Sequence, residues 1–443
     1  MSILLTSTLV GISIIAIIIL TSRLKLKAFI ALFIVSLFLA FTTLPANTIV
    51  STIKEGFGNT MASIGFLIIL GAIIGITLDK TGGTLSIARY ILSKTGENRS
   101  APALGITGFI TGLPIFCDSG FIILSGLAKS FSSKSKLAMP FMATVLATSL
   151  YSVHCLIPPH PGALAAAGLI KVNIGYLIII GTIFAIPGAL AAYYWSKWMT
   201  KGKKYPSAKE VEVDTRITYD NLPSAFLSFL PIVVPLLLIT FRSLFSLIDK
   251  GGQSLISKIF FFPGEPIFAL SIGVVLAMLL IKDKTIASMN AVFSEAIEKA
   301  GPILIVTAAG GMFGMVIKAT GTGDAMGKLL AGTSIGLVVP FLIATVMKTA
   351  QGSSTVAIIT TASFVAPMLS MLGLDSEWGR LLAMLSMGAG SMIVSHANDS
   401  YFWVVSNFSD IEPDTTLKVY SSSTILMGIV VFACVWITSL IVL

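Results

Sequence analysis

Uncharged, apolar stretches of about 20 residues recur along the whole sequence, and each is long enough to cross the ~30 Å hydrocarbon layer of a bilayer as a helix. Only 11% of the residues are charged and the mean hydropathy is +0.95, whereas soluble proteins carry about 25% charged residues. These features exclude a soluble enzyme, a disordered scaffold and a secreted disulfide domain. They predict an all-α polytopic membrane protein, with apolar stretches at about 3–20, 28–45, 60–78, 101–128, 138–157, 174–195, 224–241, 263–281, 301–318, 333–372, 381–396 and 420–442.

The net charge of +9 does not indicate a nucleic-acid partner, because the basic residues lie mostly in short loops between apolar stretches, where they orient helices. The cysteines Cys117, Cys155 and Cys434 are odd in number and lie in apolar segments, which argues against disulfides and a cysteine metal site. No phosphate-binding P-loop motif occurs, and no histidine shares a metal-ligand spacing with Cys or Glu. We therefore predict no cofactor and no metal. The first apolar stretch lacks a preceding basic region and is read as a retained helix.

A charged connector at 201–222 divides the chain into halves covering 1–200 and 223–443, which suggests an internal duplication. An offset of 239 residues aligns them without a gap over about a hundred positions. Gly71, Gly75 and Gly82 fall on Gly310, Gly314 and Gly321. The segment 146–161, which contains a proline-rich break, falls on 385–400, which contains an Asn-Asp break. We predict that the two halves are structural repeats.

The relative orientation of the repeats follows from the two stretches that are too long for one crossing, 101–128 and 333–372. If each is a re-entrant hairpin, each half crosses the bilayer five times and the second repeat is inverted. With the amino terminus outside, this topology places most of the 29 Lys and Arg residues inside, as the positive-inside rule requires. Inverted repeats with interrupted helices in matching positions are typical of secondary transporters.

Polar residues gather at four predicted helix breaks. In the first, Gly112 to Gly120, Asp118 lies among apolar residues, where an ionisable group is costly and indicates function; alternatively it caps the following helix. The second contains Gln351, Gly352, Ser353, Ser354 and Thr355. Its amide, hydroxyls and exposed helix N–H groups suit an anion, unless the hydroxyls bond to their own helix.

The third break, 154–162, contains three prolines and two histidines, and the fourth, 395–400, is its repeat partner. The offset makes His160 and Asp399 equivalent. His160 could titrate near neutral pH, although a single histidine is more often structural. Asn398 and Asp399 offer a donor and acceptors, while His154 and His396 are weaker candidates.

The segments G-L-P-I-F-C-D-S-G, P-P-H-P-G, A-Q-G-S-S-T-V-A and S-H-A-N-D-S-Y-F-W, in this order, resemble those of the gluconate permease family. The resemblance covers nearly the whole chain. It implies proton-driven uptake of a small hydroxy-acid anion across the bacterial inner membrane. The wider ion-transporter superfamily implies a homodimer, with a scaffold and a moving transport domain that contains both hairpins. The residues that the resemblance places at the substrate site are Asp118 and Ser119 in the first hairpin, Gln351, Gly352, Ser353, Ser354 and Thr355 in the second, and His160, Asn398 and Asp399 alongside.

We therefore expect a multi-pass transporter for an anion of the gluconate, glycerate or D-serine class, working by elevator-type alternating access. Asp118, Asp399 and His160 are the candidates to carry the coupled proton. Sodium coupling is an alternative, because unpaired carbonyls at broken helices can ligate Na⁺. A polytopic membrane enzyme that uses Asp118 and Asp399 is an alternative of another class, and an ion channel is a third.

Overall fold

The computed structural model describes residues 3–24, 26–95, 100–113, 115–202, 205–208, 222–248, 261–320, 334–396 and 399–443, and every regular element in these ranges is helical. Most of the charged connector 201–222 lies outside them. The helices are α1 (Ile3–Ser22), α2 (Ala28–Thr43), α3 (Ala46–Thr81), α4 (Gly83–Thr95), α5 (Ser100–Thr111), α6 (Cys117–Ser135), α7 (Met139–Leu156), α8 (Pro161–Leu169), α9 (Ile174–Thr200), α10 (Ala225–Ile248), α12 (Pro266–Met278), α13 (Ile286–Ala319), η3 (Ser334–Leu337), α15 (Val338–Gln351), α16 (Ser354–Val365), η4 (Ala366–Met368), α17 (Glu377–Met392), α18 (Ser400–Phe408), α19 (Pro413–Thr416), η5 (Leu417–Ser421) and α20 (Ser422–Val442).

Each predicted apolar stretch contains one or two helices, which confirms the all-α fold class. By length and composition, five helical segments of the described chain can cross a membrane, and six if the bent α3 is one span. Helices α3 and α13 are longer than their apolar stretches, with 36 and 34 residues. The difference arises because hydropathy marks only the apolar part of a helix, whereas both helices begin with polar turns. The count of five crossings in each half remains a prediction.

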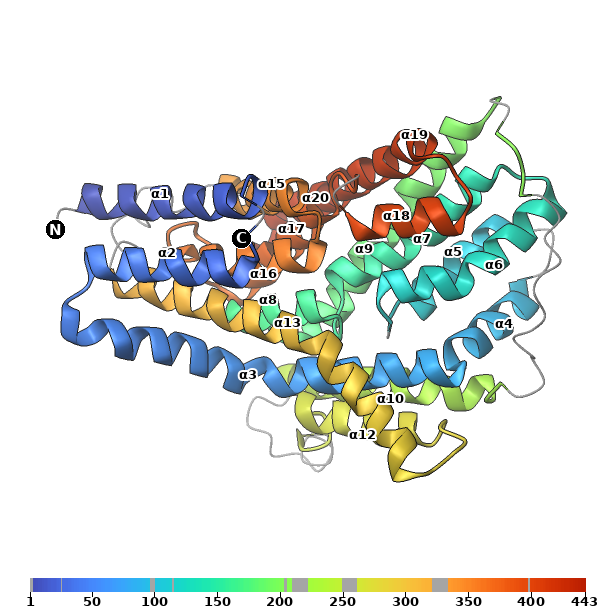
Figure 1. Cartoon of the computed structure of the whole chain (residues 1–443), viewed down its shortest axis with the longest axis horizontal. Coiled ribbons are helices and arrows are strands. Elements are labelled where there is room, and N and C mark those ends of the chain that lie inside the picture. The colour runs from blue at the N-terminus through green and yellow to red at the C-terminus, as the bar shows by residue number, and fades with distance from the viewer. Residues whose placement is uncertain are drawn as a thin grey trace.

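The long helices α3 and α13 lie side by side and run in opposite directions (Figure 1). Gly56, near the start of α3, packs against the backbone of Gly311 near the end of α13. At the other end of the pair, Lys80 Nζ lies 2.7 Å from Glu295 Oε2. Glycine at the crossing lets the two backbones approach closely, as in other membrane helix pairs.

The helix bounds follow the offset found in the sequence. Adding 239 to the bounds of α3, α7 and α8 gives 285–320, 378–395 and 400–408, and the structure has α13, α17 and α18 within three residues of these bounds. The packing follows the same relation: α2 contacts α13 as α12 contacts α3, and α8 contacts α16 as α18 contacts α6.

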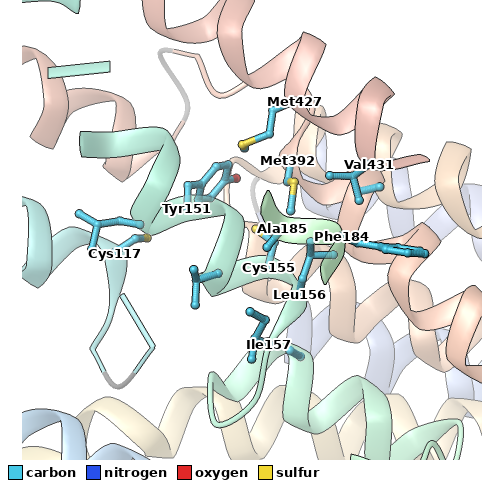
Figure 2. Packing of buried hydrophobic residues seen from close by; sticks show 14 of the residues in the cluster. Cys117, Tyr151, Cys155, Leu156, Ile157, Phe184, Ala185, Met392, Met427 and Val431 are labelled. Atoms are coloured by element: carbon cyan, nitrogen blue, oxygen red, sulfur yellow. The ribbon is translucent and has the colours of Figure 1, made fainter. Parts of the chain in front are cut away.

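The centre of the molecule is α7, in which all 18 residues are buried. Helices α5 and α6 pack against it, while α15 and α16 pack against α17, which also contacts α7. Figure 2 shows the core around the end of α7, where side chains from α6, α9, α17 and α20 surround Tyr151, Cys155 and Leu156. Large apolar side chains on α1, α2, α10 and α20 are instead exposed at the molecular surface, which suits contact with lipid. Helices that flank the predicted breaks therefore pack around the buried α7: they are α5, α6, α8, α16, α17 and α18.

Candidate functional site

The break between α15 and α16 is a two-residue turn. Helix α15 ends at Gln351, and Gly352 follows with φ of 83°, a left-handed conformation that glycine adopts without steric cost. The Oγ of Ser353 then accepts a hydrogen bond from the N–H of Val356 at 3.3 Å and caps α16. Ser354 and Thr355 occupy the first turn of α16. We call residues 351–355 the second tip.

The break between α5 and α6 spans residues 112–116, of which Pro114 lies outside the described residues. We call residues 112–119 the first tip. The N-cap residue of α6 is Phe116, whose side chain makes no capping hydrogen bond, and Asp118 follows it in the first turn. Its Oδ1 is buried and has no hydrogen-bond partner in the described part of the chain. Asp118 therefore does not occupy the N-cap position, and its carboxylate interacts with its own backbone N–H in the first turn of α6.

The remaining two breaks separate α7 from α8 and α17 from α18. Proline at the first position of α8 needs no hydrogen-bond donor there, which fixes the start of this helix after the proline-rich break. His160 is the N-cap residue of α8 and Asp399 is that of α18. The two residues that the offset made equivalent thus occupy the same position relative to their helices. Asp399 Oδ1 accepts a hydrogen bond from the N–H of Tyr401 at 3.0 Å.

Lys348, one turn before the second tip, forms a buried ion pair with Asp399. Lys348 Nζ lies 2.5 Å from Asp399 Oδ2, and the two side chains are only 1% and 5% exposed. Lys348 also donates to the carbonyl of Gly352 at 2.5 Å, and Ser395 Oγ donates to Asp399 Oδ2 at 2.5 Å. Because a buried charge must be paired and hydrogen bonded, this network fixes the second tip to the break before α18.

The backbone of the break before α18 is strained and is held by other helices. Val394 has φ of 55°, a conformation that β-branched residues rarely adopt. Its neighbour Ser395 receives a hydrogen bond on its carbonyl from Ser421 and donates its N–H to Thr424 Oγ1 at 3.3 Å. Non-helical backbone at membrane depth is tolerated where protein groups satisfy it in this way.

A chain of hydrogen bonds through two histidines joins the two tips. His160 Nε2 lies 2.6 Å from the carbonyl oxygen of Gly112 in the first tip. His160 Nδ1 lies 3.2 Å from His154 Nδ1, and His154 Nε2 lies 3.2 Å from Thr355 Oγ1 in the second tip. Both histidines are buried. The chain thus spans the site from one tip to the other.

The direction of these hydrogen bonds follows from the one group that can only accept. The Gly112 carbonyl requires a proton on His160 Nε2, so the Nδ1 of a neutral His160 accepts from His154 Nδ1. His154 Nε2 then accepts from the hydroxyl of Thr355. We assign these tautomers from the network. A proton added to His160 requires the His154 tautomer to change, so the chain can respond to protonation along its whole length.

The polar atoms left unpaired at the site belong to opposite tips. Both side-chain polar atoms of Gln351 are buried without a hydrogen-bond partner among the described residues, as is Asp118 Oδ1. The Asp118 carboxylate interacts electrostatically with Lys348 and Asp399. Gln351 lies three residues after Lys348 in one helix, so the two side chains share a face. A polar ligand with hydrogen-bonding groups can satisfy these atoms.

The structure separates the other predicted residues into different roles. Ser353 caps a helix, as described above, and the hydroxyl of Ser119 interacts with the carboxyl group of Asp79 in α3. Asn398 lies outside the described residues. His396 is half-buried and its Nε2 lies 3.3 Å from the carbonyl of Thr349. Asp118, Gln351, Thr355, His160 and Asp399 remain as side chains brought together at the tips.

Two residues at the site were not among the predicted ligands: Lys348 and His154. Lys348 was available from the sequence, since it is an ionisable residue within the apolar α15, the same signal that identified Asp118. His154 is the weaker candidate in the sequence because a single histidine is more often structural, and its partner Thr355 lies 201 residues away. No group of three His, Cys, Asp or Glu residues in the described ranges can hold a metal ion.

Comparisons with known proteins show the family to which the chain is similar. The family described as "GntP family permease" matches residues 3–441. The "Inner membrane permease YgbN" of Escherichia coli is 30% identical over 440 residues, 96% of each chain. The "Gluconate permease" of Pseudomonas aeruginosa is 28% identical over 441 residues, covering 97% of this chain and 96% of that protein.

A solved structure of Neisseria gonorrhoeae MtrF, described as illuminating a class of antimetabolite efflux pumps, matches with a TM-score of 0.64 at 15% identity. The match covers 88% of this chain and 83% of that one. The YdaH transporter of Alcanivorax borkumensis matches with a TM-score of 0.53 at 13% identity, covering 89% of each chain. At these identities the likeness concerns the fold alone.

Proposed function

The chain belongs to the GntP permease family, and we propose that it imports gluconate or a related small hydroxy-acid anion across the bacterial cytoplasmic membrane by proton symport. The family and the relatives are permeases, so the chain is a multi-pass membrane transporter and not an enzyme, which excludes the membrane-enzyme alternative. The substrate follows from relatives named gluconate permeases. Their names describe those proteins, so gluconate is the first compound to test here.

The single observation that carries the proposal is the buried Lys348–Asp399 ion pair, one turn before Gln351, whose amide has no partner among the described residues. In the proposed complex, the substrate carboxylate binds at the second tip, where Lys348 supplies a positive charge and Gln351 and Thr355 supply hydrogen bonds. Charge-assisted hydrogen bonds of this kind are the stronger ones. The hydroxyl groups of the substrate bind Asp118 and Asn398. The Asp118 carboxyl group can accept hydrogen bonds, and the Asn398 amide can both donate and accept them.

Charge balance supports coupling to a proton at Asp118. With Asp118 ionised, the empty site holds one positive and two negative groups: Lys348, Asp399 and Asp118. An added anion makes this imbalance worse, at a cost of several kcal/mol in a low-dielectric region. A proton on Asp118 restores the original net charge. Protonating Asp118 breaks no ion pair, whereas protonating Asp399 breaks its pair with Lys348, so Asp118 is the proposed carrier.

The histidine chain supplies a route by which protonation at one tip affects the other. His160 contacts the first tip and His154 the second. A proton on His160 reverses the hydrogen bond to His154 and then the one to Thr355. We propose that this chain couples the positions of the tips to the occupancy of the site.

Alternating access through two inverted repeats is supported by the packing. The equivalent helices α3 and α13 are antiparallel, and contacts between α8 and α16 are repeated between α18 and α6. We propose that the hairpins at 101–128 and 333–372 belong to a moving transport domain, and that the protein is a homodimer. Cross-linking in native membranes and mass measurement of the purified protein test the dimer.

Uptake by purified protein in liposomes tests the function. Labelled gluconate should accumulate when the outside is made more acidic in sodium-free buffer, and a protonophore should abolish accumulation. Unlabelled glycerate, lactate and D-serine, added separately as competitors, identify the preferred acid. Accumulation that requires a sodium gradient and ignores the pH gradient would favour the sodium alternative and refute proton symport.

A further inference from the structure

A second polar cavity lies away from the two tips. It has a volume of about 630 Å³ and lies between α3, the ends of α8 and α13, and the segment from α16 to the start of α17. Ser363 lines this cavity and Ser354 lies at the tip. Ser363 lies nine positions after Ser354 in helix α16, a distance of roughly 13 Å at 1.5 Å per residue. Helices α8 and α16 each run from the site to this cavity.

Three cations line the cavity: Lys171, Lys318 and Arg380. None of them forms an ion pair within the described part of the chain. The Nε of Arg380 is buried without a hydrogen-bond partner among the described residues. Asp375 is the acidic residue of the lining, and it accepts a hydrogen bond from Ser370 at 3.2 Å. The cavity therefore has an excess of positive charge.

The repeat relation shows that this charge is specific to one end of the molecule. The residues 239 positions away from Lys171 and Lys318 are Asp410 and Asp79, so both equivalent positions carry the opposite charge. Lys171 and Asp410 even share a left-handed backbone, with φ of 57° and 52°. Asp410 is paired with Lys129 at 2.6 Å. The cationic groups thus gather at one end, while an acidic counterpart at the other end is already neutralised.

Hydroxyl and amide groups complete the lining. Asn59, Thr60 and Ser63 follow one face of α3, and Ser363 and Ser370 lie opposite. Positive charge with several neutral hydrogen-bonding groups suits a small carboxylate that carries hydroxyls. Clefts lined by one sign of charge raise the local concentration of the opposite ion and its association rate.

We propose that this cavity is an outer vestibule that captures hydroxy-acid anions before they reach the tips. The inference rests on the proposed function for the direction of transport. The predicted topology places Lys171, Lys318 and Arg380 on the outer side, so the vestibule faces incoming substrate. The vestibule raises the association rate of the anion, whereas the tips select the substrate and couple its transport to the proton.

Steady-state uptake gives the first test. Lys318→Gln and Arg380→Gln should each raise the KM for gluconate by about three- to tenfold with kcat within about twofold, since removing a steering charge lowers the association rate. The charge-conserving Lys318→Arg should behave as wild type. Lys54→Gln is the matched control, because Lys54 is an exposed cation of α3 that does not line the cavity. An unchanged KM in both cavity variants would overturn the proposal, as would a fall in kcat alone.

A cysteine reporter gives a second test that does not depend on the substrate. Ser63 is exposed and lines the cavity, so Ser63→Cys can react with membrane-impermeant methanethiosulfonates, which form a disulfide and release sulfinate. We measure the rate of labelling from outside by the anionic sulfonatoethyl reagent, divided by the rate for the cationic trimethylammonioethyl reagent. This ratio should be higher at Ser63→Cys than at Ser51→Cys, an exposed site on the same helix. Adding Lys318→Gln should lower that ratio about threefold or more.

The outcomes separate the two proposals. If no acid is transported but the reagent ratio behaves as predicted, the proposed function fails and the cationic vestibule stands. If gluconate is transported and the ratio at Ser63→Cys equals that at Ser51→Cys with or without Lys318, the vestibule is refuted and the function stands. Labelling only from the inner side would also refute the outer vestibule.

Discussion

Lys348 Nζ and Asp399 Oδ2 lie 2.5 Å apart in the buried centre of the protein and join two helix breaks that are 51 residues apart in the sequence. The pair belongs to the site itself, because Lys348 precedes the second tip and Asp399 caps α18. Removing one charge leaves the other buried and unpaired, which typically costs about 3–5 kcal/mol.

We therefore expect Lys348→Met to lower the melting temperature of the purified protein strongly. The double variant Lys348→Met/Asp399→Asn, which removes both charges and keeps a capping side chain, should recover much of this loss but not transport. Lys129→Met is the control, because it breaks an ion pair whose Asp410 side chain is 77% exposed, worth about 1 kcal/mol or less. Equal melting temperatures for the single and double variants would contradict a paired role.

Replacing Gln351 should raise the melting temperature, in contrast to replacing Lys348. Its buried amide has no partner among the described residues, and such a group costs about 1–3 kcal/mol in the folded state. Gln351→Met should therefore raise the melting temperature while reducing gluconate uptake and the stabilisation that added gluconate gives. Thr360→Val removes a buried hydroxyl away from the tip that also has no partner in the described part of the chain, and it should raise stability without affecting uptake. Loss of stability in Gln351→Met would show that the amide is satisfied within the protein.

The histidine chain predicts a requirement for the hydroxyl group of Thr355. Thr355→Val keeps the shape but leaves His154 Nε2 without its donor, which costs about 1 kcal/mol or more. We expect the uptake rate to fall by about tenfold, while Thr355→Ser stays near wild type. If valine and serine behave alike in initial-rate measurements, the hydrogen bond to His154 has no role in transport.

Close packing at Gly162 positions α8 against the second tip. A Cβ added at Gly162 would lie 3.0 Å from Thr355 Cα, a backbone atom that cannot move without shifting the tip. Gly162→Ala should therefore cost about 1–3 kcal/mol and impair uptake. Gly126→Ala in α6, where nothing lies within 4 Å of the new atom, should be neutral or stabilising. Equal uptake by both variants would show that the tip tolerates displacement.

The helix breaks were predictable from the sequence because their causes are local. Glycine at 352 and the prolines before α8 act within one turn of the helices that they end or begin. The equivalence of His160 and Asp399 came from the offset between repeats, and both are N-cap residues. The family resemblance is confirmed by the match over residues 3–441.

The partnerships across the site were not predictable in the same way. Lys348 meets Asp399 across 51 residues, and His154 meets Thr355 across 201. Such contacts depend on how helices pack, which hydropathy does not encode. Ser353 was expected at the ligand, and its hydroxyl caps α16, which is the local alternative that the sequence left open. The lengths of α3 and α13 were missed for a different reason, because their polar turns carry no hydropathy signal.

The most direct test of proton symport measures both fluxes in one preparation. Purified protein in lightly buffered, sodium-free liposomes with an internal pH dye should acidify the lumen as labelled gluconate enters, with about one proton per anion, the number that charge balance at the site requires. Asp118→Asn should exchange gluconate but neither acidify the lumen nor accumulate substrate. Gluconate entry without any proton signal in the wild-type protein would contradict the account.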